Sequence, residues 1–166
     1  MADGETMVRM GEIAVSGDPG HVLVSLGLGS CIGLALLDRH RGRAGLAHVV
    51  LPHSQGHGTE NPMKFADLAL PELLRRLVAI GARKPALEAV LVGGASMFAT
   101  TSHALEVGMR NESAVREQLE QLRIPVVATA TGGNRGRTIR VDVASGGVTV
   151  REAGGTDAPL VKGDPA

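Results

Sequence analysis

The sequence is short of aromatic residues: its 166 residues include two Phe, no Tyr and no Trp. A core built without aromatics must be packed from aliphatic side chains, and apolar residues make up 43% of the chain. This length suits one domain with a core of its own. No internal repeat and no linker between two apolar regions interrupts the chain. We therefore expect a single domain.

Charge of one sign is also missing, since 17 Lys and Arg are matched by 17 Asp and Glu. Nucleic-acid binding is therefore disfavoured, because it depends on clustered cationic side chains. No apolar run is long enough to cross a bilayer, and residues 1–9 lack the apolar region of a signal peptide. The single cysteine, Cys31, excludes an internal disulfide. These absences predict a cytoplasmic protein that binds no nucleic acid and does not insert into membranes.

Short apolar runs separated by turn residues predict seven or eight strands, with two or three helices. The strands are expected at 7–15, 21–26, 31–37, 44–51, 87–92, 126–131, 138–143 and 148–152. One helical pattern covers 65–78, and Asn111 is the predicted N-cap of another helix. We expect one α/β (α+β) domain over 7–152, with packed, largely antiparallel sheets flanked by helices. Residues 1–6 are expected to be disordered and 153–166 to form a mobile tail.

Cys31 follows a glycine-rich turn that contains Gly27, Gly29 and Ser30. A lone cysteine is usually a small buried hydrophobe, and the apolar neighbours of Cys31 fit that interpretation. A glycine-rich turn, however, brings backbone N–H groups close to the sulfur, where they can bind an oxyanion. Cys31 is therefore a candidate nucleophile, and Gly29 and Ser30 are the candidate oxyanion-binding residues.

The apolar runs at 31–37 and 44–51 predict a β-hairpin that brings His48 toward Cys31. With a two-residue loop, Cys31 lies directly opposite His48. With a four-residue loop, the two residues are diagonal neighbours on one face of the sheet. A three-residue loop places them on opposite faces. Two of the three registers therefore allow a thiol–imidazole contact.

That contact would make Cys31 reactive. A nearby imidazolium favours the thiolate, which attacks an amide or ester carbonyl. His48 can then protonate the departing ammonia and later activate a water molecule. Ser25, on the preceding predicted strand, is the candidate for orienting the imidazole. The spacing alone leaves open that Ser25 is an ordinary strand serine and that His48 is a core histidine.

Three other signals are weaker. The glycines at 27, 29 and 33 miss the spacing of a dinucleotide-binding turn, and no helical pattern follows them. His53 and His57 lie in a polar loop, where two histidines without further ligands are more often solvated than bound to a metal. Residues 132–137 (GGNRGR) fit either an anion site or a hairpin loop with solvated charges. We predict no metal site.

Six motifs follow one another along the chain: SLGLGSC at 25–31, AHVVLP at 47–52, KFAD at 64–67, GGASMF at 93–98, GMRN at 108–111 and TGGNRGR at 131–137. Together and in this order they resemble the CheD family of chemoreceptor glutamine deamidases. The resemblance extends from about residue 7 to residue 152. It is more specific than any one of the motifs, because several separate segments contribute to it.

The resemblance implies that Cys31 and His48 are catalytic, and that Ser25 occupies the place of the family's threonine. Serine keeps the hydroxyl but lacks the methyl that stiffens the threonine rotamer. The implied fold is similar to toxin-type deamidases, and no cofactor is implied. The implied substrates are glutamines, and by related chemistry glutamate methyl esters, on the cytoplasmic helices of chemoreceptors. A CheC-type phosphatase is the second implied partner.

The expected function is chemoreceptor glutamine deamidation through a cysteine thioester, in chemotaxis adaptation. Two alternatives stay open at this point. The first is a non-catalytic adaptor that binds a CheC-type phosphatase or a receptor. The second is an unrelated thiol hydrolase that acts on small amides.

Overall fold

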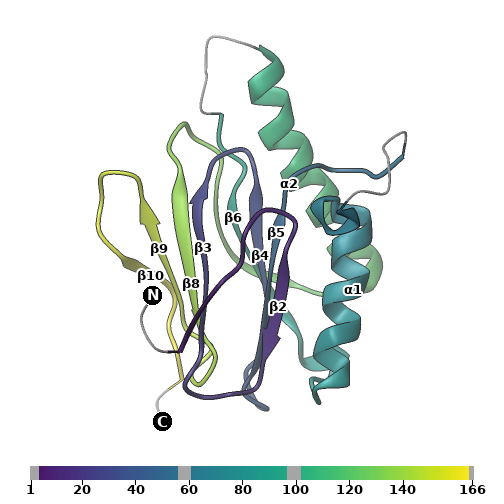
Figure 1. The fold of residues 1–166 in the computed structure, drawn as a ribbon, viewed down its shortest axis with the longest axis vertical. Helices are drawn as coiled ribbons and strands as arrows, with labels where there is room; N and C mark the ends of the chain where they lie inside the picture. Colours follow the sequence, from purple (N-terminus) through teal and green to yellow (C-terminus); the bar gives the residue numbers. More distant parts are fainter. Residues whose placement is uncertain (1–3, 56–60, 97–101, 165–166) are drawn as a thin grey trace.

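The computed structural model describes residues 4–55, 61–96 and 102–164. Within these residues the chain forms two five-stranded sheets, with the orders β1-β3-β8-β9-β10 and β2-β5-β4-β6-β7, and two α-helices (Figure 1). The elements in chain order are β1 (Glu5–Met7), β2 (Ile13–Ser16), β3 (Val22–Leu28), β4 (Ile32–Asp38), β5 (Arg43–Val49), η1 (Pro62–Lys64), α1 (Ala66–Ala79), η2 (Lys84–Ala86), β6 (Glu88–Gly93), α2 (Ser102–Leu122), β7 (Val126–Thr131), β8 (Arg137–Asp142), β9 (Val148–Glu152) and β10 (Ala158–Val161).

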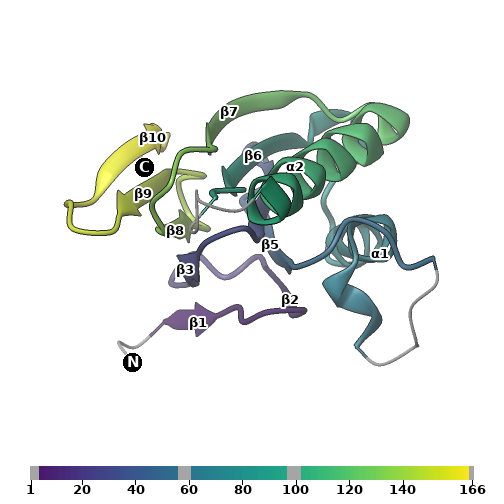
Figure 2. The ribbon, with the colours of Figure 1, turned by 90° about the horizontal axis from the view of Figure 1, so that it is seen from above.

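The two sheets face each other, and both helices cover the outer face of the β2-β5-β4-β6-β7 sheet (Figure 2). Strand β4 shows how the layers are built. Its residues Ala35 and Leu37 point into the cluster between the sheets, whereas Leu34 and Leu36 pack against the helices. Because both faces of β4 are buried, its sequence is a continuous apolar run without polar alternation.

The predicted fold class, a single α+β domain with largely antiparallel sheets, is confirmed. The β1–β3 and β6–β7 pairs are parallel, and the other pairs of named strands are antiparallel. The first predicted helix corresponds to α1, which continues through Pro71 as one helix. None of the helices in the described part of the chain has the length and apolar character to span a membrane.

The prediction of one strand over 7–15 is wrong. The structure has two strands there, β1 and β2, and they belong to different sheets. The chain crosses from one sheet to the other between them, through Gly11 at a φ of 75°. A positive φ is readily adopted by glycine and ends the extended run. This crossing places Val8 beside Ser25 of β3 and His48 of β5, which matters for the site.

Three further expectations differ from the structure. Asn111 is not an N-cap, because it lies in the middle of α2. The interval 153–166 contains β10, which pairs with β9, and Leu160 and Val161 pack against the cluster between the sheets. These two apolar side chains give the end of the chain a reason to stay ordered. Likewise, β1 begins at Glu5, inside the interval expected to be disordered.

Candidate functional site

Cys31 and His48 share one face of the β4–β5 hairpin. Asp38 pairs with Arg43 and Gly33 pairs with His48, which is the register of the four-residue loop. Cys31 directly precedes β4, so it is the diagonal neighbour of His48 across the pair. Cys31 packs against the cluster between the sheets. His48 lies two residues after Leu46 of that cluster, so the two side chains share one face of β5. The pair therefore lies at one end of the space between the two sheets.

Cys31 is partly exposed and carries a free thiol. Burial raises the pKa of this thiol, and its own backbone N–H, which bonds to the sulfur, opposes the rise. A thiol that is fully buried in a core is out of reach of a substrate, whereas the partly exposed sulfur of Cys31 can be reached. The position of Cys31 is therefore compatible with a nucleophile that reacts at the surface.

His48 is almost fully buried, with 5% of its surface exposed. Its Nδ1 lies 3.1 Å from the backbone oxygen of Val8. A carbonyl oxygen only accepts, so Nδ1 carries the proton and the Nε2 of the neutral ring is free to take one. Burial lowers the pKa of His48, while the bond to Val8 and the charge of Glu12 oppose that change.

Burial acts in the same sense on both members of the pair. Burial favours the neutral form of both Cys31 and His48. Neither side chain donates to the other in the described residues. With Nδ1 bonded to the Val8 oxygen, Nε2 is the ring nitrogen that can accept a proton.

Ser25 and His48 bind the same acceptor. The Ser25 side chain is fully buried, and its Oγ donates to the Val8 oxygen over 2.7 Å. A bulge in β3 between Ser25 and Leu28 lets both residues face the cluster between the sheets. Ser25 therefore lies where the sequence places the orienting residue, but it reaches the imidazole through a shared carbonyl.

Val8 carries no signal in the sequence, because it contributes to the site through its backbone oxygen. The segment after β1 also binds the backbone of His48: Gly11 N–H donates to the His48 oxygen over 2.9 Å, and His48 N–H donates to the Glu12 oxygen over 3.1 Å. Gly11, which interrupts an alternating run, is the signal that indicates a turn there. Four hydrogen bonds to this segment thus involve His48 or Ser25.

The turn before Cys31 is held by its carbonyl groups. The oxygens of Gly29, Ser30 and Cys31 accept, in that order, from Ala95 N–H at 2.8 Å, Asn111 Nδ2 at 2.9 Å and Gly94 N–H at 2.9 Å. In a planar trans peptide the next N–H points the opposite way. The N–H groups of Ser30 and Cys31 therefore point away from these partners.

The other motif residues serve this turn or lie outside it. A Cβ at Gly93 would overlap the Cys31 oxygen, which explains a glycine there. Arg137 is buried and donates to the oxygen of Gly132 over 2.7 Å, so it ties its own loop and is not a free anion-binding group. Arg135 is exposed. His53 is also exposed, and His57 and residues 97–98 lie outside the described residues.

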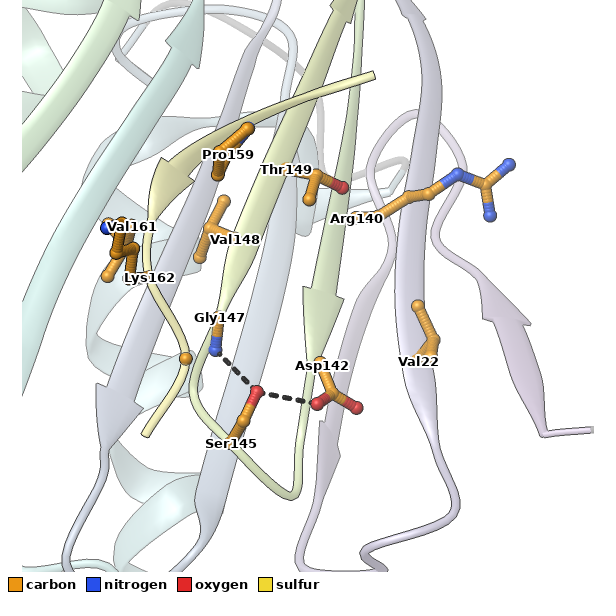
Figure 3. A pocket seen from close by; sticks show the side chains of 11 residues that line it. Val22, Arg140, Asp142, Ser145, Gly147, Val148, Thr149, Pro159, Val161 and Lys162 are labelled. Atoms are coloured by element: carbon orange, nitrogen blue, oxygen red, sulfur yellow. Dashed lines mark hydrogen bonds between the residues drawn. The ribbon is translucent and has the colours of Figure 1, made fainter. Parts of the chain in front are cut away.

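A cavity of about 540 Å³ lies elsewhere, on the β1-β3-β8-β9-β10 sheet (Figure 3). Its lining includes Val22, Asp142, Ser145 and Val161. These residues come from the start of β3, the ends of β8 and β10 and, for Ser145, the turn between β8 and β9, whereas Cys31 follows the far end of β3. The cavity and the candidate site therefore lie at opposite ends of the same strands. No group of three His, Cys, Asp or Glu side chains is placed to hold a metal among the described residues.

Comparison with known proteins gives two results. Residues 50–152 match the family model described as "CheD chemotactic sensory transduction". A protein of Clostridium kluyveri named "Probable chemoreceptor glutamine deamidase CheD" is 43% identical over 153 residues, which cover 90% of this chain and 94% of the relative. A Clostridium botulinum strain Hall protein of the same name has the same identity and coverage. A relative from strain Alaska E43 is 42% identical over 157 residues, covering 93% of this chain and 96% of its own.

The family model begins after the candidate site, but the relatives include it. An aligned stretch that covers 90% of a 166-residue chain cannot leave out residues 25–48. Ser25, Cys31 and His48 therefore lie within the region similar to those relatives.

Proposed function

Because the chain belongs to the CheD family, we propose that it is a chemoreceptor glutamine deamidase with Cys31 as its nucleophile and His48 as its base. The observation that carries this proposal is the common face of the two residues: a partly exposed thiol and an imidazole with a free Nε2 are neighbours on one hairpin. The names of the relatives supply the substrate, a glutamine side chain on a chemoreceptor. The reaction needs no cofactor.

The reaction has two halves. The Cys31 thiol gives its proton to His48 Nε2, and the sulfur attacks the glutamine Cδ. His48 then gives that proton to the departing ammonia as the C–N bond breaks, leaving a thioester on Cys31. In the second half, a water molecule loses a proton to Nε2 and attacks the thioester. The C–S bond breaks, the sulfur recovers a proton, and glutamate is released.

Both halves pass through an oxyanion on the substrate. The N–H groups of Ser30 and Cys31 are the proposed donors, since the carbonyls of the same turn are held on the other side. The bond from Nδ1 to Val8 keeps Nε2 as the basic nitrogen throughout. Ser25, which binds the same oxygen, supports that carbonyl from the β3 side. A glutamate methyl ester would react by the same steps, with methanol as the leaving group.

The product is a new carboxylate on a receptor helix, which repels neighbouring acids and shifts the signalling equilibrium of the receptor. We place this reaction in the cytoplasm, where a single cysteine stays reduced. The family resemblance adds a CheC-type phosphatase as a binding partner. A pull-down of such a phosphatase by this protein, with and without alkylation of Cys31, tests that part separately.

The central test is incubation with the cytoplasmic fragment of a chemoreceptor, followed by mass spectrometry of its peptides and an ammonia assay. The wild-type protein is expected to convert specific glutamines to glutamates. Cys31→Ala is expected to abolish conversion, and His48→Gln to reduce it by at least about 10²-fold. Conversion by Cys31→Ala at the wild-type rate would refute the assignment of the nucleophile.

The same experiment separates the alternatives. The serine at position 25, in place of the family threonine, is the one observation in favour of a non-catalytic adaptor. Binding to receptor fragments without ammonia release from any of them would support the adaptor. Release of ammonia from free glutamine or short unstructured peptides, at a rate equal to that on receptors, would instead support a thiol hydrolase of small amides.

A further inference from the structure

Asn111 is a buried polar residue in the middle of α2, where a capping role is excluded. Its Nδ2 donates to the oxygen of Ser30 and to the oxygen of Val50, both over 2.9 Å. Ser30 directly precedes Cys31, and Val50 follows the strand that carries His48. One side chain thus joins the two segments on which the thiol and the imidazole are mounted.

The side chain is not arranged for stability alone. Its Oδ1 is buried and has no hydrogen-bond partner among the residues that the structure describes. Buried acceptors without a partner are unfavourable, and asparagine is a weak former of helix interiors. The two donated bonds also fix the orientation of the amide, because the reverse orientation would turn its oxygen toward two other oxygens. The unpaired Oδ1 is a cost to stability, so we assign the two donated bonds a role in holding the segments that they join.

From these contacts we infer that Asn111 is a positioning residue of the catalytic site: it fixes the Ser30–Cys31 peptide plane and holds it against the end of the His48 strand. This inference rests on the proposed function for its meaning in catalysis. Its structural core is independent of any substrate.

Asn111 acts on the chemistry through the peptide group between Ser30 and Cys31. With the Ser30 oxygen bound on the helix side, the Cys31 N–H points the opposite way. That N–H favours the thiolate of Cys31, because it lowers the pKa of the thiol. It is also a proposed oxyanion donor. Without the Asn111 bond the plane is free to rotate, and both contributions weaken.

Asn111 is fully buried, so it does not touch a substrate. Its loss is therefore expected to reduce kcat and to leave KM unchanged. Asn111→Leu removes both donors with little change in size. We expect kcat on a receptor fragment to fall about 10²-fold, the effect of a misplacement of about 1 Å. We also expect alkylation of Cys31 by iodoacetamide to begin at a higher pH than in the wild-type protein.

The matched control is Asp38→Asn. Asp38 is also fully buried and also joins two segments, since it accepts from the N–H of Arg41 over 3.2 Å and of Arg83 over 2.8 Å. It lies at the other end of β4 from Cys31. We expect this variant to lose thermal stability but to keep the wild-type kcat and alkylation profile. A loss of kcat that comes only from lower stability would appear in both variants.

Asn111→Ser is the second variant, in case Asn111→Leu does not fold; its short side chain leaves room for a water molecule. The inference is overturned if a folded Asn111 variant has the kcat and the alkylation profile of Asp38→Asn. Alkylation does not require turnover, so the two proposals are distinguishable. A shifted alkylation profile without deamidation of any receptor by the wild-type protein supports the positioning role and refutes the proposed function. Deamidation by the wild-type protein that is unchanged in the Asn111 variants supports the proposed function and refutes the positioning role.

Discussion

Gly33 and Gly45 offer a matched pair of substitutions on the two faces of the same sheet. Gly33 pairs with His48, and a side chain at this position would point between the sheets. A Cβ there would lie 2.8 Å from Leu28 Cδ1 and 3.2 Å from Ile139 Cγ2. Neither glycine has a positive φ. The effect of alanine at either position is therefore steric.

Gly45 faces the helices instead. A Cβ at this position would lie 2.7 Å from Leu73 Cδ1 and 3.0 Å from Val15 Cγ1. Overpacking of this kind destabilises a core by about 1–3 kcal/mol. For a chain of this size each kcal/mol lowers Tm by about 2–4 °C. Thermal unfolding followed by circular dichroism is expected to show losses of this size for both Gly33→Ala and Gly45→Ala.

Activity is expected to separate the two variants. The added methyl group of Gly33→Ala requires Leu28 to move, and Leu28 lies at the start of the turn that leads to Cys31. We therefore expect Gly33→Ala to lose about 10-fold to 10²-fold in kcat on a receptor fragment, at a temperature where both variants are folded. Gly45→Ala, with contacts at least as tight, is expected to keep the wild-type kcat. Equal kcat values for the two variants would refute the placement of the reacting groups between the sheets.

Further predictions concern pH, Ser25 and Arg137. Because burial lowers the pKa of His48, the folded protein binds a proton there less readily than the unfolded chain, so stability is lost as the pH falls below about 6.5; His48→Gln is expected to flatten this acid limb in thermal unfolding. Because burial raises the pKa of Cys31, stability is lost as the pH rises through its titration, and Cys31→Ala is expected to flatten the alkaline limb. Ser25→Ala is expected to lower the free energy of unfolding by about 1 kcal/mol, measured by urea denaturation, and to reduce kcat less than His48→Gln, because Nδ1 keeps its bond to the Val8 oxygen. Ser25→Thr is expected to retain full activity. Arg137→Ala is expected to lower stability by about 1–3 kcal/mol because it leaves the Gly132 oxygen without its donor. An acid limb unchanged in His48→Gln, or a Ser25→Ala kcat as low as that of His48→Gln, would contradict the assigned contacts.

The pairing of two neighbouring strands made one part of the candidate site predictable from the sequence, namely the approach of Cys31 and His48. The β4–β5 hairpin places Cys31 and His48 on one face because successive residues of a strand alternate between its faces. The loop length, which chooses among the registers, was left open by the sequence. The short apolar run of β4 correctly indicated a strand, and the structure shows that both of its faces are buried.

Asn111 and Val8 were beyond such rules. Asparagine favours helix N-caps, so local preference placed Asn111 at the start of a helix. In the structure its amide instead binds carbonyls that are 61 and 81 residues away in the chain. Val8 contributes a backbone oxygen. Every residue has this group, so the residue type at position 8 gives no sign of it.

Local patterns in the chain were enough to indicate an aliphatic core, a mostly antiparallel α+β domain, one thiol and a histidine placed to meet it. How these groups are held depends on the packing of distant segments. The crossing of the chain between the sheets brings the Val8 oxygen to His48, and the packing of α2 brings Asn111 to the turn before Cys31. The difference lies in the range of the interactions: strand alternation is local and readable, whereas hydrogen bonds between distant segments exist only after the segments have packed.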